Sequence, residues 1–166
     1  MHIEDIFEDL EAQFDAALQN EQRDTFTDNA RAIEVCTLNQ VKRDLIAPII
    51  GDGFLAGLDA ISPIWHVYPT KSLRNVVFHS EIDESLPKLR TFDIDLATFL
   101  DTIPTPCSVR WRIHGATEYL NSGKLHSMSG QFLFLYQANA MRPIAVPIHA
   151  LEQLVIESVD NLNGDF

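Results

Sequence analysis

The sequence is poor in positive charge and in cysteine, and it has no long apolar run. Its 166 residues hold 12 Lys and Arg against 24 Asp and Glu, and a formal net charge of −12 argues against general nucleic-acid binding. Two cysteines do not imply a disulfide framework, so both are expected to be reduced packing thiols. No run approaches eighteen apolar residues and no signal-peptide pattern opens the chain, so we expect a cytoplasmic protein with no membrane role.

Motifs for catalysis and for cofactor binding are absent from the sequence as well. It contains no Gly-rich phosphate loop, no G-x-S-x-G elbow and no H-E-x-x-H zinc motif. His114, His126 and His149 lie in the same half of the chain as Cys107, but none of them has the spacing of metal ligands. Surface or strand-face histidines are the preferred interpretation. The sequence therefore predicts no enzyme, no cofactor and no metal site.

Acidic residues gather outside two nearly neutral segments. The net charge is −8 over residues 1–30, −4 over residues 81–106 and −3 over residues 157–166. It is +1 over residues 31–80 and +2 over residues 107–156. We therefore predict an acidic amphipathic helix and linker, a first β unit, a connector with a short helix, a second β unit and a tail, with these same boundaries.

The two β units share an internal repeat. Residues 54–78 align without a gap on residues 132–156, and six of the 25 aligned positions are identical. Upstream of this alignment, Val109, Trp111 and Ile113 alternate with polar residues, which is the period of a half-buried strand. Each unit reads as about five short antiparallel strands, which are expected to curl into a small barrel. The residues expected to point inward are Ile33, Val35, Phe54, Val76 and Phe78 in the first barrel, and Val109, Trp111, Phe132, Leu154 and Ile156 in the second.

One helix is predicted before each barrel. Between the barrels, Asp93 or Asp95 caps a short helix whose apolar stripe is Leu96, Phe99 and Leu100. The N-terminal helix has an apolar stripe and acidic other faces. We expect it to lie on its own barrel or to bind a partner, and its anionic face argues against a membrane surface. This partner-helix stripe consists of Ile3, Ile6, Phe7, Leu10, Phe14 and Leu18.

The order of a helix, five strands and a Pro-marked corner before the last strand is clearest in the second unit. There it is carried by Val109-x-Trp111-x-Ile113-x-Gly115 and by Pro147. This pattern resembles the Sm-like fold, the SH3-type barrel of the Sm and Hfq proteins. Together the two units resemble a bacterial family of tandem Sm-like barrels led by an acidic helix. The resemblance implies a mainly β fold class with helices: two tandem Sm-like, SH3-like five-stranded antiparallel barrels, each preceded by a helix.

The resemblance also implies a uridine pocket, made of an Asp-x-Phe-x-Asn turn and an Arg-Gly step. This chain keeps Asp52 and Phe54 but has Ala56 where the base-reading Asn belongs. The Arg-Gly step is Pro69-Thr70 in the first unit. In the second unit, Gly130 and Phe134 replace both polar members of the turn, and Pro147-Ile148 replaces the step. These departures disfavour RNA recognition in the manner of the family.

One basic cluster is a candidate binding surface. Arg110, Arg112 and His114 are predicted on the outward face of one strand, with Lys124 and His126 on a neighbouring strand. This face either binds an anion, such as RNA phosphate or an acidic peptide, or is an ordinary solvated strand face. The leading hypothesis is a non-enzymatic interaction or scaffold module that binds protein partners and forms a homodimer. The alternative is an RNA-associated Sm-like protein that binds through this face.

Overall fold

The structure is a computed structural model, and it describes residues 29–59, 61, 64–79, 84–115, 121–137 and 142–159, apart from the side chains of the last two. Eleven strands form a single sheet, and α3 (Leu96–Asp101) is the one α-helix in this part of the chain. Two short 3-10 turns, η1 (Thr70–Ser72) and η2 (Ile148–Ala150), complete the regular structure. The strands are β1 (Ala32–Thr37), β2 (Lys42–Asp52), β3 (Phe54–Asp59), β4 (Trp65–Pro69), β5 (Leu73–His79), β6 (Arg90–Asp95), β7 (Cys107–Ile113), β8 (Asn121–Ser129), β9 (Phe132–Gln137), β10 (Pro143–Pro147) and β11 (Leu151–Val159).

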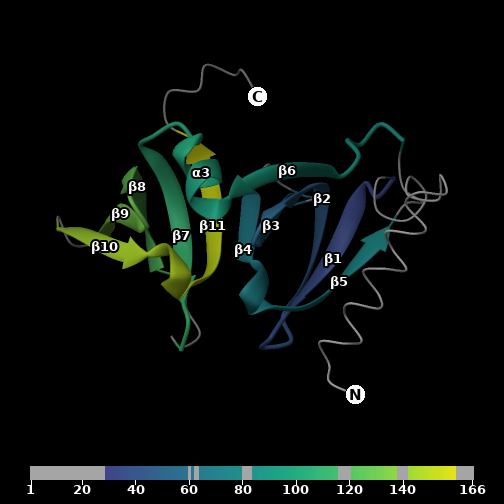
Figure 1. Cartoon of the computed structure of the whole chain (residues 1–166), viewed down its shortest axis with the longest axis horizontal. Coiled ribbons are helices and arrows are strands. Elements are labelled where there is room, and N and C mark those ends of the chain that lie inside the picture. Colours follow the sequence, from purple (N-terminus) through teal and green to yellow (C-terminus); the bar gives the residue numbers. More distant parts are fainter. Residues whose placement is uncertain are drawn as a thin grey trace.

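The sheet consists of two halves that repeat one strand order (Figure 1). The first half-sheet, strands β1 to β5, runs β4-β3-β2-β1-β5, and the second, strands β7 to β11, runs β10-β9-β8-β7-β11. The pairing register repeats too, because Val35 opposes Val76 in the first half-sheet as Trp111 opposes Leu154 in the second. β6 lies outside this path and pairs in parallel with β2.

Strands β4 and β11 pair antiparallel and join the two halves, with His66 opposite Val155 (Figure 1). We call this joint the seam. Closing a half-sheet into a barrel would require β4 to bond back to β5, but β4 bonds to β11 instead. The predicted fold class, two five-stranded barrels each preceded by a helix, is therefore wrong: the structure is one open sheet. The predicted N-terminal helix lies outside the described residues.

The hydrophobic core follows the seam and does not divide into one core per half-sheet. The larger cluster surrounds Trp111 and takes in Phe54, Ala56 and Val67 from the first half-sheet. Leu55, which lies between Phe54 and Ala56 on β3, faces the opposite way into the smaller cluster. β3 is thus buried on both faces. The smaller cluster consists of Ile33, Val35, Leu45, Leu55 and Tyr68.

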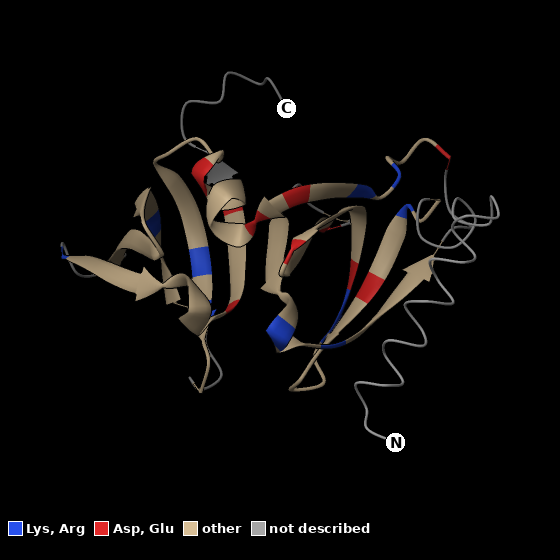
Figure 2. Ribbon diagram, viewed as in Figure 1, with Lys and Arg blue, Asp and Glu red and all other residues tan. Residues whose placement is uncertain are grey.

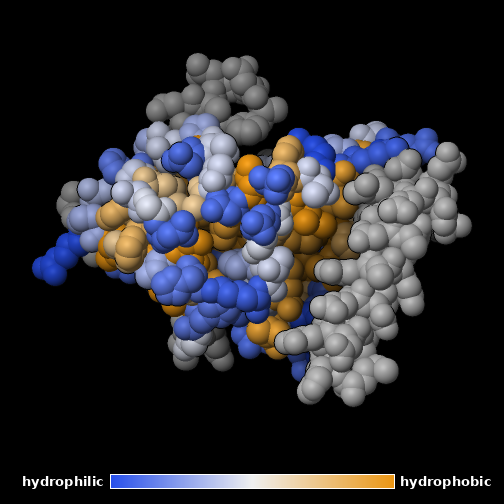
Figure 3. Space-filling model, in the orientation of Figure 1, coloured by the Kyte–Doolittle hydropathy of each residue, from blue (hydrophilic) through white to orange (hydrophobic). Residues whose placement is uncertain are grey.

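Two of the residues predicted to point inward are misplaced by the barrel interpretation. Phe54 was assigned to the core of its own unit but packs in the larger cluster, where its ring centroid lies 4.9 Å from that of Phe99. Phe132 was assigned to the second core but is 44% exposed. Val76 and Phe78 are only partly buried, and they pack against the smaller cluster. Figure 3 shows hydrophobic surface over the first half-sheet, which agrees with a smaller cluster that the described residues cover only in part.

Helix α3 forms as the sequence predicts and closes the larger cluster. The Asp95 side chain caps it by accepting a hydrogen bond from the Thr98 backbone N–H at 2.8 Å. Hydrogen bonding to the Thr98 side chain, and then to its backbone, holds the pKa of this carboxyl below its usual value. Leu96 and Leu100 are buried against the second half-sheet. No helix in the described part of the chain is long and apolar enough to cross a membrane.

Candidate functional site

A row of hydrogen-bonded polar side chains crosses one face of the seam. The Gln153 amide of β11 donates to the Tyr68 hydroxyl at 3.1 Å and contacts His66 Nδ1 at 3.2 Å. On the other side of His66, its Nε2 lies 3.7 Å from Asp59 Oδ2, and Arg43 Nη1 lies 3.3 Å from the same oxygen. This row connects strands β2, β3, β4 and β11, so it fixes the two half-sheets to each other by side chains as well as by backbone.

The contacts of His66 define its protonation state. The Gln153 amide nitrogen can only donate, so Nδ1 accepts and carries no proton, and the ring proton sits on Nε2 facing Asp59. Burial, together with the nearby Arg43 guanidinium, lowers the His66 pKa from 6.5 to about 4, although Asp59 acts in the opposite direction. Burial likewise raises the pKa of the Tyr68 hydroxyl. Both groups are therefore neutral at neutral pH.

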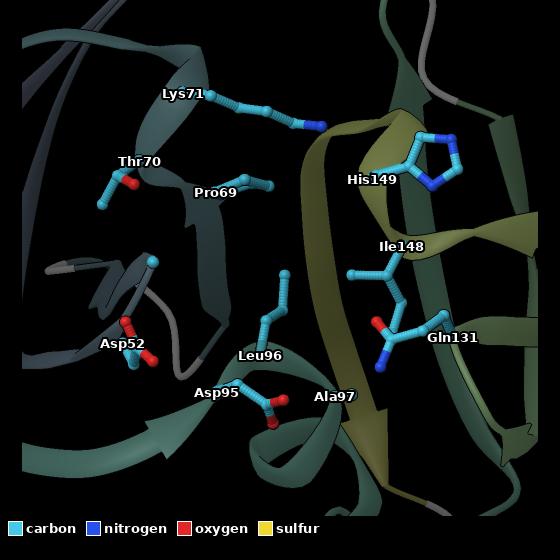
Figure 4. Close-up of a pocket in the computed structure, with 11 residues that line it drawn as sticks. Asp52, Pro69, Thr70, Lys71, Asp95, Leu96, Ala97, Gln131, Ile148 and His149 are labelled. Atoms are coloured by element: carbon cyan, nitrogen blue, oxygen red, sulfur yellow. The ribbon is translucent and has the colours of Figure 1, made fainter.

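A cavity of about 250 Å³ lies at one end of the seam, where corresponding turns of the two half-sheets meet. In Figure 4 the side chains of Lys71 and His149 lie along one side of it and the carboxylates of Asp52 and Asp95 along the other. Pro69 and Ile148, which stand at the Arg-Gly step of the Sm-like pattern, also line it. Ala56, which stands at the base-reading position, is fully buried and does not reach it. The cavity is therefore lined by charged groups of both signs together with apolar side chains.

The structure brings four of the five predicted binding residues onto one sheet face. Arg110 and Arg112 lie on β7 and alternate with the buried Val109 and Trp111, which face the core. Lys124 and His126 lie on the adjacent strand β8, where Lys124 opposes Ser108. His114 lies just beyond β7, where its backbone N–H donates to the Ala150 carbonyl at 2.9 Å.

The positive charge of this face is reduced by Glu157 of β11, which forms an ion pair with Arg110. Lys124, His126 and Glu157 line a hollow of about 500 Å³. Tyr136 also lines it, and the His126 ring meets the Tyr136 ring edge-on with 5.5 Å between centroids. The face therefore combines cations, an acid and an aromatic ring, which is a mixed surface.

The two ends of the sheet present strand edges that no other described strand covers. Strands β5 and β10 each pair with one neighbour only among the described residues. β10 contains no charged residue, and Arg74 is the only lysine, arginine or acid of β5, as the mostly tan ribbons of these strands in Figure 2 show. Val77 on β5 is 45% exposed. Natural proteins usually protect such edges with charge, a bulge or a covering segment.

The chain matches no family model, no curated protein and no solved structure. In the described part of the chain no group of three or more His, Cys, Asp or Glu side chains is placed to hold a metal ion. Cys36 and Cys107 are buried thiols.

The polar row at the seam was not predicted from the sequence. One signal for it was present, because Glu152 and Gln153 interrupt the apolar residues at the start of β11, and both make contacts with the first half-sheet. The Glu152 carboxylate accepts a hydrogen bond from the Asn39 side chain at 2.9 Å. Polar residues within a buried strand indicate a partner from another element. No signal in the sequence identified His66 as a member of the row.

Proposed function

We propose that this chain is a non-enzymatic protein-interaction module whose binding sites are the open edges of its sheet. The supporting observation is that β5 and β10 each have a single strand neighbour in the described part of the chain. An extended segment that adds to such an edge gains backbone hydrogen bonds, and its alternating side chains give selectivity. The chain then acts as a scaffold in the cytoplasm.

The backbone of Ala145 is the part of the β10 edge to perturb. In the first half-sheet the Thr70 N–H, just after β4, donates to the Gly53 carbonyl, just before β3. In the second half-sheet the Ile148 N–H, just after β10, donates to the Gln131 carbonyl, just before β9. Even-numbered residues of β10 therefore turn their backbone groups toward β9, since alternate residues of a strand point to opposite neighbours. Ala145 turns its N–H outward.

The test uses the full chain and two variants at this position. Ala145→Pro removes the outward N–H without removing a bond to β9, and edge strands tolerate proline at such positions. Ala145→Val keeps the N–H and serves as the matched control. In affinity purification from native cells, partners should be recovered with the wild type and with Ala145→Val and be lost with Ala145→Pro. Recovery of the same partners with all three proteins would contradict binding at this edge.

The second candidate function is association with RNA, which takes the resemblance to Sm-like proteins as its premise. One observation favours it: Arg110, Arg112, Lys124 and His126 share a sheet face beside the ring of Tyr136, and cations next to an aromatic ring suit a single strand. The Arg110–Glu157 ion pair and the net charge of −12 oppose it. A raised ratio of absorbance at 260 to 280 nm in the purified protein would favour this candidate over the first.

A further inference from the structure

We infer that the partner of these edges is a second copy of this chain, whose β5 pairs antiparallel with β10 in the register that joins β11 to β4 at the seam. This inference rests on the proposed function, because it names the occupant of the same edges. It predicts a head-to-tail contact, in which the first half-sheet of one copy continues the second half-sheet of the next.

The repeated strand order is the first step toward this inference. β4 and β10 occupy the same place in the two half-sheets, and so do β11 and β5. Each half-sheet thus has two kinds of edge, one formed by β4 or β10 and the other by β5 or β11, and the seam pairs one edge of each kind. When it has formed, one edge of each kind, β10 and β5, has no second strand neighbour among the described residues, and these edges lie at opposite ends of the sheet (Figure 1). Two copies can repeat the contact that each already makes internally.

The seam also fixes the register between the copies. Because the repeat has an offset of 78 residues, each pair at the seam has one counterpart at the free edges. The seam pairs are Leu154 with Val67, Val155 with His66, and Ile156 with Trp65. Their counterparts between copies are Val76 with Ala145, Val77 with Ile144, and Phe78 with Pro143.

Side chains that are buried at the seam have exposed counterparts at the free edges, as expected if a partner strand is missing there. Val155 is fully buried at the seam, whereas its counterpart Val77 is 45% exposed. On the other strand Val67 is fully buried, whereas its counterpart Ala145 is exposed. These counterparts are apolar although they face solvent. Pairing with a second copy would bury them as the seam buries their equivalents.

The contact between copies should be weaker than the seam. Val67 and Trp65 turn their N–H groups toward β11, but Pro143 replaces Trp65 and has no N–H, so one backbone donor is lost. The polar row is lost too, since Ile144 stands in the place of His66. The contact between copies is thus more apolar than the seam and has fewer hydrogen bonds. We therefore expect the association to be reversible.

The contact joins unlike edges, so it is heterologous and each copy still offers one edge after binding a neighbour. Repeating this contact adds copies one after another until the last copy binds the first and closes a ring. The homodimer expected from the sequence is the smallest such ring, with both edge contacts formed between two copies. Larger rings use the same contact.

A cysteine cross-link tests the register directly. Val76 and Ala145 would turn their backbones toward each other, so Val77 and Ile144 would form the non-hydrogen-bonded pair, with Cα atoms about 4.5 Å apart. That spacing lies within the range of about 4.4 to 6.8 Å for disulfides. Full-length Val77→Cys and Ile144→Cys proteins, one of them mass-tagged, are mixed and oxidised. Cys36 and Cys107 are buried and stay unreactive.

The matched control mixes Val77→Cys with Ala145→Cys, because a shift of one residue places the two thiols on opposite faces of the sheet. We expect the in-register mixture to form the mixed disulfide at least about tenfold faster than this control. We also expect light scattering at micromolar concentration to give a mass of two or more chains for the wild type and for Ala145→Val, and of one chain for Ala145→Pro.

Three results would overturn the inference. A wild-type monomer at micromolar concentration would do so, and if partners that depend on Ala145 were still recovered from cells, the proposed function would stand without self-association. An assembly that Ala145→Pro leaves intact, or equal cross-linking in both mixtures, would show that copies meet through another surface. A monomer that also recovers no such partner would remove both the inference and the proposed function.

Discussion

Acidification should weaken the protein through His66, the buried imidazole at the seam. Its side chain is 3% exposed, and burial with the Arg43 guanidinium lowers its pKa to about 4, against 6.5 in an unfolded chain. The unfolded state therefore binds the proton more tightly than the folded state does. The stability contributed by neutral His66 is complete above pH 6.5 and is lost as the pH falls toward 4.

The size of this effect follows from the two pKa values. A difference of one pKa unit corresponds to about 1.4 kcal/mol, so full protonation costs about 3 kcal/mol and the loss between pH 7.5 and pH 5 is about 2 kcal/mol. The structural reason is that protonated Nδ1 can no longer accept from Gln153, while Arg43 and Arg110 repel the new charge. Asp59 attracts that charge and offsets part of the loss.

Urea unfolding, followed by far-ultraviolet circular dichroism, measures the free energy of unfolding at pH 7.5 and pH 5. His66→Gln removes the titrating group from the seam, and His114→Gln, at an exposed position, is the matched control. The wild type and His114→Gln should each lose about 2 kcal/mol more between the two pH values than His66→Gln does. If His66→Gln shows the same pH dependence as the wild type, His66 is not a buried neutral group in the folded protein.

Other predictions concern the core, the β8–β9 pairing and nucleic acid. Trp111→Ala should lower the free energy of unfolding by about 3–5 kcal/mol, because this side chain is fully buried. Trp111→Phe should lower it far less. A loss close to zero for Trp111→Ala would contradict the place of Trp111 in the core. Gly123→Ala should destabilise the chain by about 1–3 kcal/mol or more, because a Cβ there would lie 2.0 Å from the Tyr136 carbonyl oxygen, whereas exposed Ser122→Ala should be near neutral in the same urea assay. In fluorescence anisotropy at physiological salt, the full chain should bind a short uridine-rich RNA no more tightly than about 10⁻⁶ M. Submicromolar binding by the full chain would favour the RNA alternative, and binding that appears only without residues 1–29 would identify them as an inhibitory arm.

Local features of the fold could be predicted from the sequence because they depend on neighbouring residues. The helix α3 follows from one capping carboxylate, Asp95, and from an apolar stripe, and both act within a few residues. The alternation along β7 likewise places Trp111 toward the core and Arg110 on the opposite face. A period of two residues reports the two faces of a strand directly.

The same period does not report which core a strand face meets, and this is why the barrel prediction is wrong. On β3, Phe54 and Leu55 are both almost fully buried but lie in different clusters. Alternation marks them as opposite in direction and cannot show that each direction leads to a core. The pairing of β4 with β11 joins strands about ninety residues apart, and no local pattern encodes a partner at that distance. The polar row around His66 depends on that pairing and was missed with it.

The seam explains why the half-sheets stay open. A five-stranded sheet that closes on itself satisfies its own edges, whereas here β4 obtains its second partner from the other half-sheet. That partner brings Val67 into the cluster around Trp111 and leaves β5 without the neighbour it would have had in a closed barrel. Exposure of apolar Val77 is a consequence of the same exchange. An edge left open by the way the chain joins its own halves is best satisfied by repeating that joint, and this links the architecture of the single chain to its proposed interaction with a second copy.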